Sequence, residues 1–173
     1  MVVGNTAQMA DDLAAGKLDL ALVEGPVHVR TLNVVRWRGD ELVVIVGRGH
    51  PWLATGRVGL KMLAAAPWII RERGSGTREV FEKAMRECVG NYDAIMELGH
   101  TEAIKKAVEA GLGVSCLSRL AVRREIENGW LFEVKTPLKL KRELSLLTDA
   151  RASESRLVEA CVRFLMFNRE DGA

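Results

Sequence analysis

Short apolar runs alternate with amphipathic stretches of about ten residues along the chain, and this alternation constrains the fold more than any other feature. Strands alternating with helices of this length are typical of the α/β class. Strands are predicted at residues 18–23, 32–37, 41–46, 67–70, 94–98, 114–117, 130–134 and 144–147. Helices are predicted at residues 7–15, 60–65, 77–88, 102–110, 119–128 and 154–167.

The boundaries of these elements carry local signals. Residues 1–3 read as the end of a strand, so the strand-helix-strand order over residues 1–23 predicts a parallel βαβ unit, with Thr6 capping the helix. Gly39-Asp40 predicts a turn between two strands. Residues 42–46 are continuously apolar, as expected of a strand buried on both faces.

Composition limits the function classes. The 173 residues carry a formal net charge of +2, whereas a nucleic-acid-binding domain typically has a strongly basic face. The three cysteines are not spaced as metal pairs, and nothing indicates a metal or another cofactor. The chain has no apolar run of the roughly 18 residues that a spanning helix needs, and its start lacks a signal-peptide pattern. We therefore expect a cytoplasmic protein without a membrane partner.

One motif predicts an anion site. Ser75, Gly76, Thr77 and Arg78 lie between a short apolar run and an amphipathic helix. Glycine lets the backbone approach a ligand, the amides of a first helical turn attract anions, and the two hydroxyls add donors. The motif lacks both the Walker A ending and the third glycine of a dinucleotide fingerprint. A capped helix after a flexible turn, with nothing bound, is the alternative.

Four segments, in this order, resemble the effector-binding domain of LysR-type transcriptional regulators. They are residues 16–23 (GKLDLALV), 49–53 (GHPWL), 60–69 (LKMLAAAPWI) and 110–118 (AGLGVSCLS). The resemblance covers nearly the whole chain. It implies a type II periplasmic-binding-protein-like fold, in which two Rossmann-like lobes are joined by two crossover strands. Lobe one would be residues 1–44 plus 144–173, and lobe two residues 45–143.

The resemblance also implies a function. A small anionic metabolite would bind between the lobes as the effector and thereby control transcription, and the regulator would act as a homodimer. The family's first strand and helix of lobe one, and its helix-turn-helix, have no counterpart in this sequence. We therefore expect DNA contact only through an amino-terminal domain outside this chain, and an unpaired edge beside residues 18–23.

The family's cleft positions are carried over to named residues. Ser75, Gly76, Thr77 and Arg78 would form one wall, although Arg78 could instead pair with Glu82 one turn along the helix. Thr101 would both cap its helix and contact the effector, with a plain N-cap as the alternative. The neighbouring His100 is a pH-sensitive candidate contact, whose alternative, a surface loop histidine, is favoured.

Glu24 and Gly25 end a strand of lobe one at an edge where α/β proteins bind ligands. A solvated glutamate at the end of a strand is the alternative reading of Glu24. The full set of predicted ligand-binding residues is therefore Ser75, Gly76, Thr77, Arg78, Thr101, His100, Glu24 and Gly25.

Two rival functions share the implied fold. A free-standing solute-binding protein would need export, for which the sequence shows no signal. An enzyme resembling prephenate dehydratase would carry Thr-Arg-Phe facing the cleft, whereas Glu79 follows Thr77-Arg78 here. No set of nucleophile, base and acid is visible, so we expect no catalytic residues.

Overall fold

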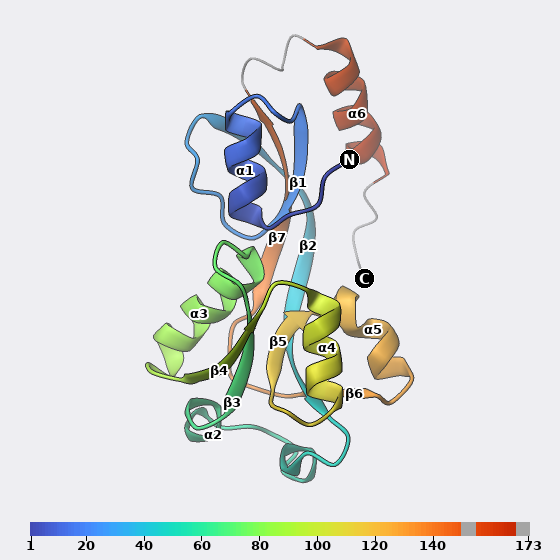
Figure 1. The fold of residues 1–173 in the computed structure, drawn as a ribbon. Helices are drawn as coiled ribbons and strands as arrows, with labels where there is room; N and C mark the ends of the chain where they lie inside the picture. Colours follow the sequence, from blue (N-terminus) through green and yellow to red (C-terminus); the bar gives the residue numbers. More distant parts are fainter. Residues whose placement is uncertain (150–154, 169–173) are drawn as a thin grey trace. The chain divides into compact units, whose positions relative to one another are not determined.

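The computed structural model describes residues 1–149 and 155–168 and shows a mixed α/β chain that divides into two compact units (Figure 1). Unit 1 comprises residues 1–40, 74–76 and 142–173, and unit 2 comprises residues 41–73 and 77–141. Strands β2 (Leu32–Gly47) and β7 (Lys141–Asp149) each have residues in both units. These two neighbouring strands are the crossover strands of the fold.

Unit 1 is built on the order β1-β7-β2 (Figure 1). Its other elements are α1 (Thr6–Ala14), β1 (Leu20–Glu24) and α6 (Arg156–Phe167). The apolar face of α1 packs on this sheet because its buried side chains recur at helical spacing. The core consists of Met9, Ala10, Leu13, Ala21, Val23, Leu32 and Leu147.

The predicted parallel βαβ unit is wrong. Residues 1–3 form no strand, and β1 pairs antiparallel with β7, with Leu22 opposite Leu146. Sequence periodicity shows that a strand exists but not which distant strand will pair with it. Among the described residues, β1 has β7 as its one strand partner and is an edge strand of its sheet.

The predicted turn at Gly39-Asp40 is also wrong, because β2 continues through both residues without a break. The Asp40 carboxylate accepts a hydrogen bond of 2.7 Å from Nε of Arg142 on β7. Both side chains are almost completely buried, with exposed fractions of 2% and 1%. This ion pair places a typical turn residue inside a strand.

The start of α1 differs from the prediction as well. Asn5, not Thr6, is the N-cap, and its side chain accepts a hydrogen bond from the backbone N–H of Gln8. Thr6 is buried as the first helical residue, and its Oγ1 donates to the carbonyl of Glu24 over 2.9 Å. The hydroxyl therefore ties α1 to the end of β1.

Unit 2 contains two hydrophobic cores, one on each face of β2. Leu42, Val44 and Val46 face the first core, whereas Val43 and Ile45 face the second, as the two-residue period of a strand requires. The prediction that this run is buried on both faces is confirmed. The strand pairs antiparallel with β5 (Ser115–Ser118) and with β6 (Leu131–Val134).

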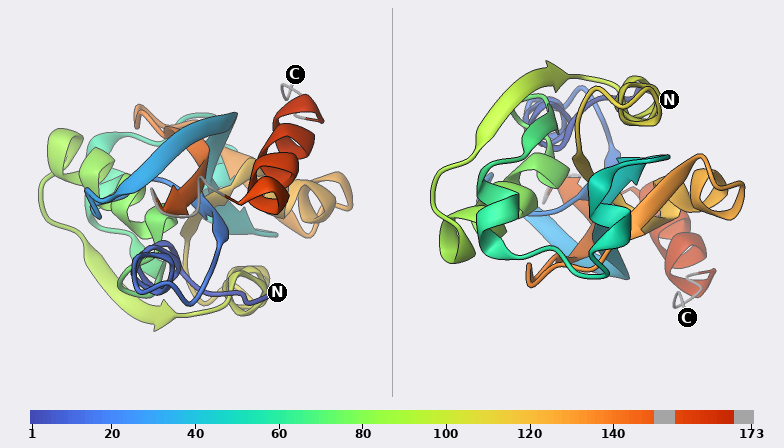
Figure 2. Two further views of the ribbon diagram at one scale, coloured as in Figure 1. Left: turned by 90° about the horizontal axis from the view of Figure 1, so that it is seen from above. Right: turned by 90° about the horizontal axis from the view of Figure 1, so that it is seen from below.

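Helices cover both cores of unit 2. The first core includes residues from η1 (Pro51–Ala54), α2 (Leu60–Ala64) and α3 (Gly76–Cys88). The second includes residues from α4 (Thr101–Glu109) and α5 (Arg119–Glu127), which pack on β3 and β6 respectively (Figures 1 and 2). Strands β3 (Pro67–Arg71) and β4 (Asp93–Leu98) form a separate parallel pair.

The predicted helices are thus confirmed to within a few residues, although Glu154, the predicted start of the last one, lies outside the described residues.

A buried ion pair joins helices α4 and α5. Nζ of Lys105 on α4 lies 2.9 Å from Glu125 on α5 and also donates to the carbonyl of Ala121. Burial lowers the pKa of Lys105, but Glu102 and Glu125 outweigh this effect and raise the pKa overall.

Candidate functional site

The parallel pairing of β3 and β4 determines where the predicted site residues of unit 2 lie. Both strands end at the same edge, β3 at Arg71 and β4 at Leu98. Helix α3 follows β3 and α4 follows β4, so both helices begin close to this edge (Figure 1). In α/β folds the carboxyl edge of parallel strands is where ligands bind, and helix N-termini there attract anions.

Thr101 is the first residue of α4 rather than its N-cap. The N-cap is His100, which makes no capping hydrogen bond with its side chain and is exposed. Nη1 of Arg71 donates to Oγ1 of Thr101 over 3.2 Å. Since the hydroxyl accepts this bond, its own proton points elsewhere and can be donated to a ligand.

Arg71 was missed by the sequence analysis. Its guanidinium is held by a bidentate pair with Glu72, with distances of 2.7 and 2.9 Å, and its side chain is 15% exposed. A planar guanidinium fixed in this way presents its remaining N–H groups in a defined direction. Its position directly after the strand predicted at residues 67–70 was the available signal, because ligand-binding residues gather at strand ends.

Arg78 is engaged in ion pairs rather than standing free at the start of α3. Nε lies 2.7 Å from Glu82, and Nη1 lies 2.6 Å from Glu97 on β4. Nη1 also donates to the carbonyl of Arg71. The hydrogen bond from Arg78 lowers the pKa of the Glu97 carboxyl. An anionic ligand of Arg78 must therefore compete with two carboxylates, one of which was the alternative partner predicted from the sequence.

Gly76 lies directly against the end of β1. A Cβ atom on Gly76 would stand 1.4 Å from the carbonyl oxygen of Glu24 and 2.9 Å from Oγ1 of Thr6. Gly25 has a φ of +94°, and its own Cβ would lie 3.0 Å from Cα of Gly76. The structure therefore brings together three predicted site residues, Glu24, Gly25 and Gly76, by backbone contact.

Two further predicted residues are the sequence neighbours of Gly76. Ser75 and Thr77, on either side of Gly76, are both buried. The Glu24 carboxylate lies 3.0 Å from Nη2 of Arg142 and is about half exposed. It is thus a partly solvated strand-end glutamate that also has a cationic partner.

Within the described residues, no group of three metal-binding side chains was found, and no helix is long and apolar enough to cross a membrane.

The chain is similar in sequence to LysR-type transcriptional regulators. The family model for the LysR substrate binding domain matches residues 1–167. The chain is 41% identical over 163 residues to the HTH-type transcriptional regulator YeiE of Escherichia coli K12, covering 94% of this chain and 55% of the relative. It is 36% identical over 127 residues to the activator CmpR of Synechocystis, covering 73% and 42%. The chain spans about half the length of the curated relatives it matches.

Solved structures show the same fold. The regulatory domain of Synechocystis CcmR in complex with 2-PG superposes with a TM-score of 0.86 at 27% identity, covering 96% of this chain and 80% of that one. The effector-binding domain of QuiR in complex with shikimate gives a TM-score of 0.84 at 20% identity, covering 96% and 78%. The type II periplasmic-binding-protein-like fold expected from the sequence is confirmed.

Proposed function

The chain belongs to the LysR substrate-binding domain family, and from this membership we propose that it is the sensor of a longer transcriptional regulator. The effector is a small anion, bound by residues at the starts of α3 and α4. In the whole protein, an effector that binds two conformations with different affinity shifts their populations and so changes transcription. DNA contact belongs to a helix-turn-helix in that longer protein, which acts in the cytoplasm.

One observation carries the anionic nature of the effector. The hydrogen bond from Arg71 to Thr101 joins a fixed guanidinium to the first turn of α4, at the carboxyl edge of β3 and β4. A ligand there meets the hydroxyl of Thr101, the free amides of the helix and the positive end of its dipole. These groups together stabilise a carboxylate, phosphate or sulfate group. Ser75, Gly76, Thr77 and Arg78 at α3, with His100, Glu24 and Gly25, remain proposed effector contacts.

Thermal unfolding against a panel of anions tests this proposal. The panel contains sulfate, phosphate, sugar phosphates, di- and tricarboxylates, 2-PG and shikimate. A ligand at 100 times its dissociation constant adds about 2.7 kcal/mol, which for a domain of this size raises Tm by about 5–10 °C. We expect one class of anion to give such a shift and Thr101→Ala to abolish it.

The control is Thr31→Ala, which removes an exposed threonine of unit 1 and should leave the shift unchanged. A panel without any shift, for a chain that unfolds cooperatively, would contradict the anionic effector. A shift that survives Thr101→Ala would remove Thr101 from the site. Because a sensor releases its ligand unchanged, NMR of the bound anion after long incubation should show no conversion, whereas conversion would indicate an enzyme.

We propose in addition that the domain forms a homodimer through α6. Three large apolar side chains of this helix, Leu157, Phe164 and Phe167, are 74%, 67% and 89% exposed. Leu157 and Phe164 are seven residues apart and so share one helical face. Exposed apolar side chains gathered on one helix mark a protein interface.

Sedimentation equilibrium tests the dimer. Phe164→Glu places a charge on this face and should shift the chain from dimers to monomers. At low protein concentration, where the wild type is also monomeric, the Tm of the variant should differ little from that of the wild type. Leu112→Glu is the matched control, since Leu112 is 54% exposed in unit 2 and lies on no helix. A wild-type chain that is monomeric at high concentration, or a dimer that survives Phe164→Glu, would contradict this interface.

A further inference from the structure

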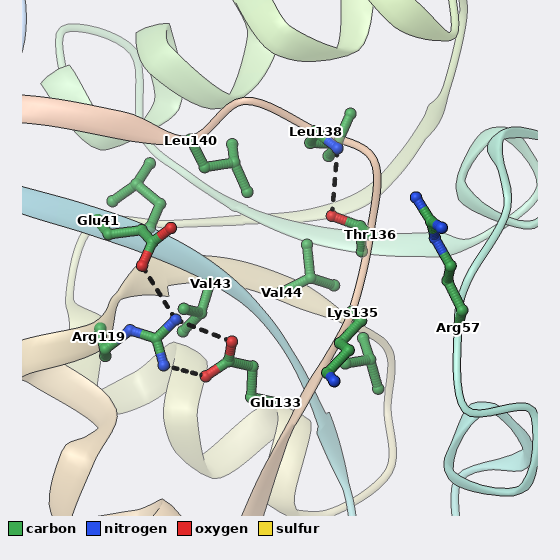
Figure 3. Close-up of a pocket in the computed structure, with 12 residues that line it drawn as sticks. Glu41, Val43, Val44, Arg57, Arg119, Glu133, Lys135, Thr136, Leu138 and Leu140 are labelled. Atoms are coloured by element: carbon green, nitrogen blue, oxygen red, sulfur yellow. Dashed lines mark hydrogen bonds and ion pairs between the residues drawn. The ribbon is translucent and has the colours of Figure 1, made fainter.

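We propose that unit 2 carries a second ligand site, which accepts a small organic monocarboxylate with a compact apolar body. The site is a cavity of about 340 Å³ beneath residues 135–140 (Figure 3). Its volume lies within the range of roughly 300–1,000 Å³ found for small-molecule sites. None of the residues proposed to bind the regulatory effector lines it, so this inference does not rest on the proposed function.

The cavity exists because the chain arches over β2. The segment leaves β6 after Val134 and returns beside β2 at Leu140 (Figure 3). A backbone hydrogen bond fixes each end, from Val58 N–H to the carbonyl of Lys135 and from Leu42 N–H to the carbonyl of Leu140, both 2.9 Å long. An arch with both ends fixed leaves a preformed space, so a ligand does not have to order the chain.

The floor of the cavity is apolar. Leu42, Val44, Val134 and Leu140 line it, are 8% exposed or less, and belong to the first core of unit 2. Leu138 at the top of the arch is half-buried and packs against the same core. An apolar ring inserted here covers hydrophobic surface at roughly 25 cal/mol per Å².

The charged side chains of the lining favour an anion. Arg119 binds Glu133 through two N–H groups and lies 3.0 Å from Glu41, so both carboxylates already have a cationic partner. Burial lowers the pKa of Arg119, but the hydrogen bonds and charges of Glu133 and Glu41 outweigh this and raise it overall. One guanidinium for two carboxylates leaves this cluster with a net charge of −1, so an anion binds away from it, on the side of Arg57.

Two further cationic side chains of the lining are available to pair with a ligand. Neither Arg57 nor Lys135 makes an ion pair or a side-chain hydrogen bond with any residue that the structure describes, and both are exposed at the rim. Three cationic and two anionic side chains thus line the cavity, whose net charge is +1. A cationic ligand is disfavoured, because the cationic side chains of the lining outnumber its carboxylates.

The polar end of the ligand is placed by Thr136. Its Oγ1 accepts a hydrogen bond from Leu138 N–H, so its proton is left to donate to a ligand. Figure 3 shows Arg57 and Thr136 on one side of the cavity, and Arg119 with its two glutamates on the other. A carboxylate between Arg57 and Thr136 leaves its apolar body over Val44 and Leu140.

Isothermal titration calorimetry with phenylacetate and cyclohexanecarboxylate tests the site, with phenylacetamide as the uncharged analogue and inorganic phosphate as the anion without an apolar body. We expect saturable binding of at least one carboxylate, one molecule per chain, and weaker binding of both controls. Arg57→Ala should weaken binding about fivefold, as expected for a partly exposed ion pair. Leu138→Trp should abolish binding by filling the cavity.

Arg123→Ala is the matched control, because Arg123 is an exposed arginine of unit 2 outside the cavity, and it should bind as the wild type does. Thr101→Ala should also bind normally, which separates this site from the effector site. If Leu138→Trp unfolds the chain, Arg57→Ala still tests the site, because Arg57 is exposed and its removal should leave the fold intact. No saturable binding of either carboxylate, equal binding of phenylacetamide, or unchanged binding by Arg57→Ala would overturn the proposal.

Discussion

Replacing Gly76 with alanine is expected to destabilise the chain by more than about 3 kcal/mol, enough to unfold a substantial fraction of it. The added Cβ would lie 1.4 Å from the carbonyl oxygen of Glu24, and this neighbour is backbone that cannot rotate away. Either β1 or the start of α3 must move, which breaks the hydrogen bond between Thr6 and Glu24. Chemical denaturation followed by circular dichroism measures the loss.

Gly39→Ala is the control for this prediction. Gly39 lies in β2 with open space around its Cα, so alanine fits there and should change stability by less than about 1 kcal/mol. Equal stability of Gly76→Ala and the wild type would mean that Gly76 and Glu24 are not in contact as described. Loss of stability by both variants would indicate a general intolerance of added side chains instead.

Asp40→Ala is expected to cost roughly 3–5 kcal/mol, because it leaves the guanidinium of Arg142 buried without its partner on β2. The ion pair between Arg142 and Glu24 is weaker than the lost one, because the Glu24 carboxylate is about half exposed to water. The same denaturation experiment measures the change. The double variant Asp40→Leu with Arg142→Met should recover much of the loss, because it removes both charges together.

An exposed pair on the same two strands gives a direct comparison. Arg36 on β2 lies 3.1 Å from Glu143 on β7, with both side chains more than half exposed. Arg36→Ala should therefore change the free energy of unfolding by less than about 1 kcal/mol. If Asp40→Ala cost no more than Arg36→Ala, burial would not be the source of the strength of the Asp40–Arg142 pair.

Most of the elements could be predicted because their signals are local. The two-residue alternation that turns Val43 and Val44 toward different cores is contained in residues 42–46 themselves. The amphipathic spacing of α3 and α4 is likewise visible within a dozen residues. Thr77 could be named because it lies in a motif between an apolar run and an amphipathic helix, whereas Thr101 was named from the resemblance to LysR-type regulators.

The errors and omissions come from contacts between distant residues. Asp40 lies in a strand because it pairs with Arg142, which is 102 positions away. The sequence around Asp40 contains no sign of this partner. Arg71 and Glu97 meet Thr101 and Arg78 through pairing of strands that are more than twenty residues apart. The alternative partner of Arg78, Glu82, lies one helical turn away, and for that reason it was predictable from the sequence.

The division of the chain also determines the order in which its parts can form during synthesis. Apart from residues 74–76, unit 2 is drawn from one continuous stretch, residues 41–141, and all the strands that pair within it except β2 begin inside that stretch. Strand β1 has to wait for β7, whose residues are translated more than a hundred positions later. Domains fold as their residues leave the ribosome, so unit 2 gains its cores while the amino-terminal segment is still without its partner. Strand β1 is therefore translated before unit 2 but becomes part of a sheet after it.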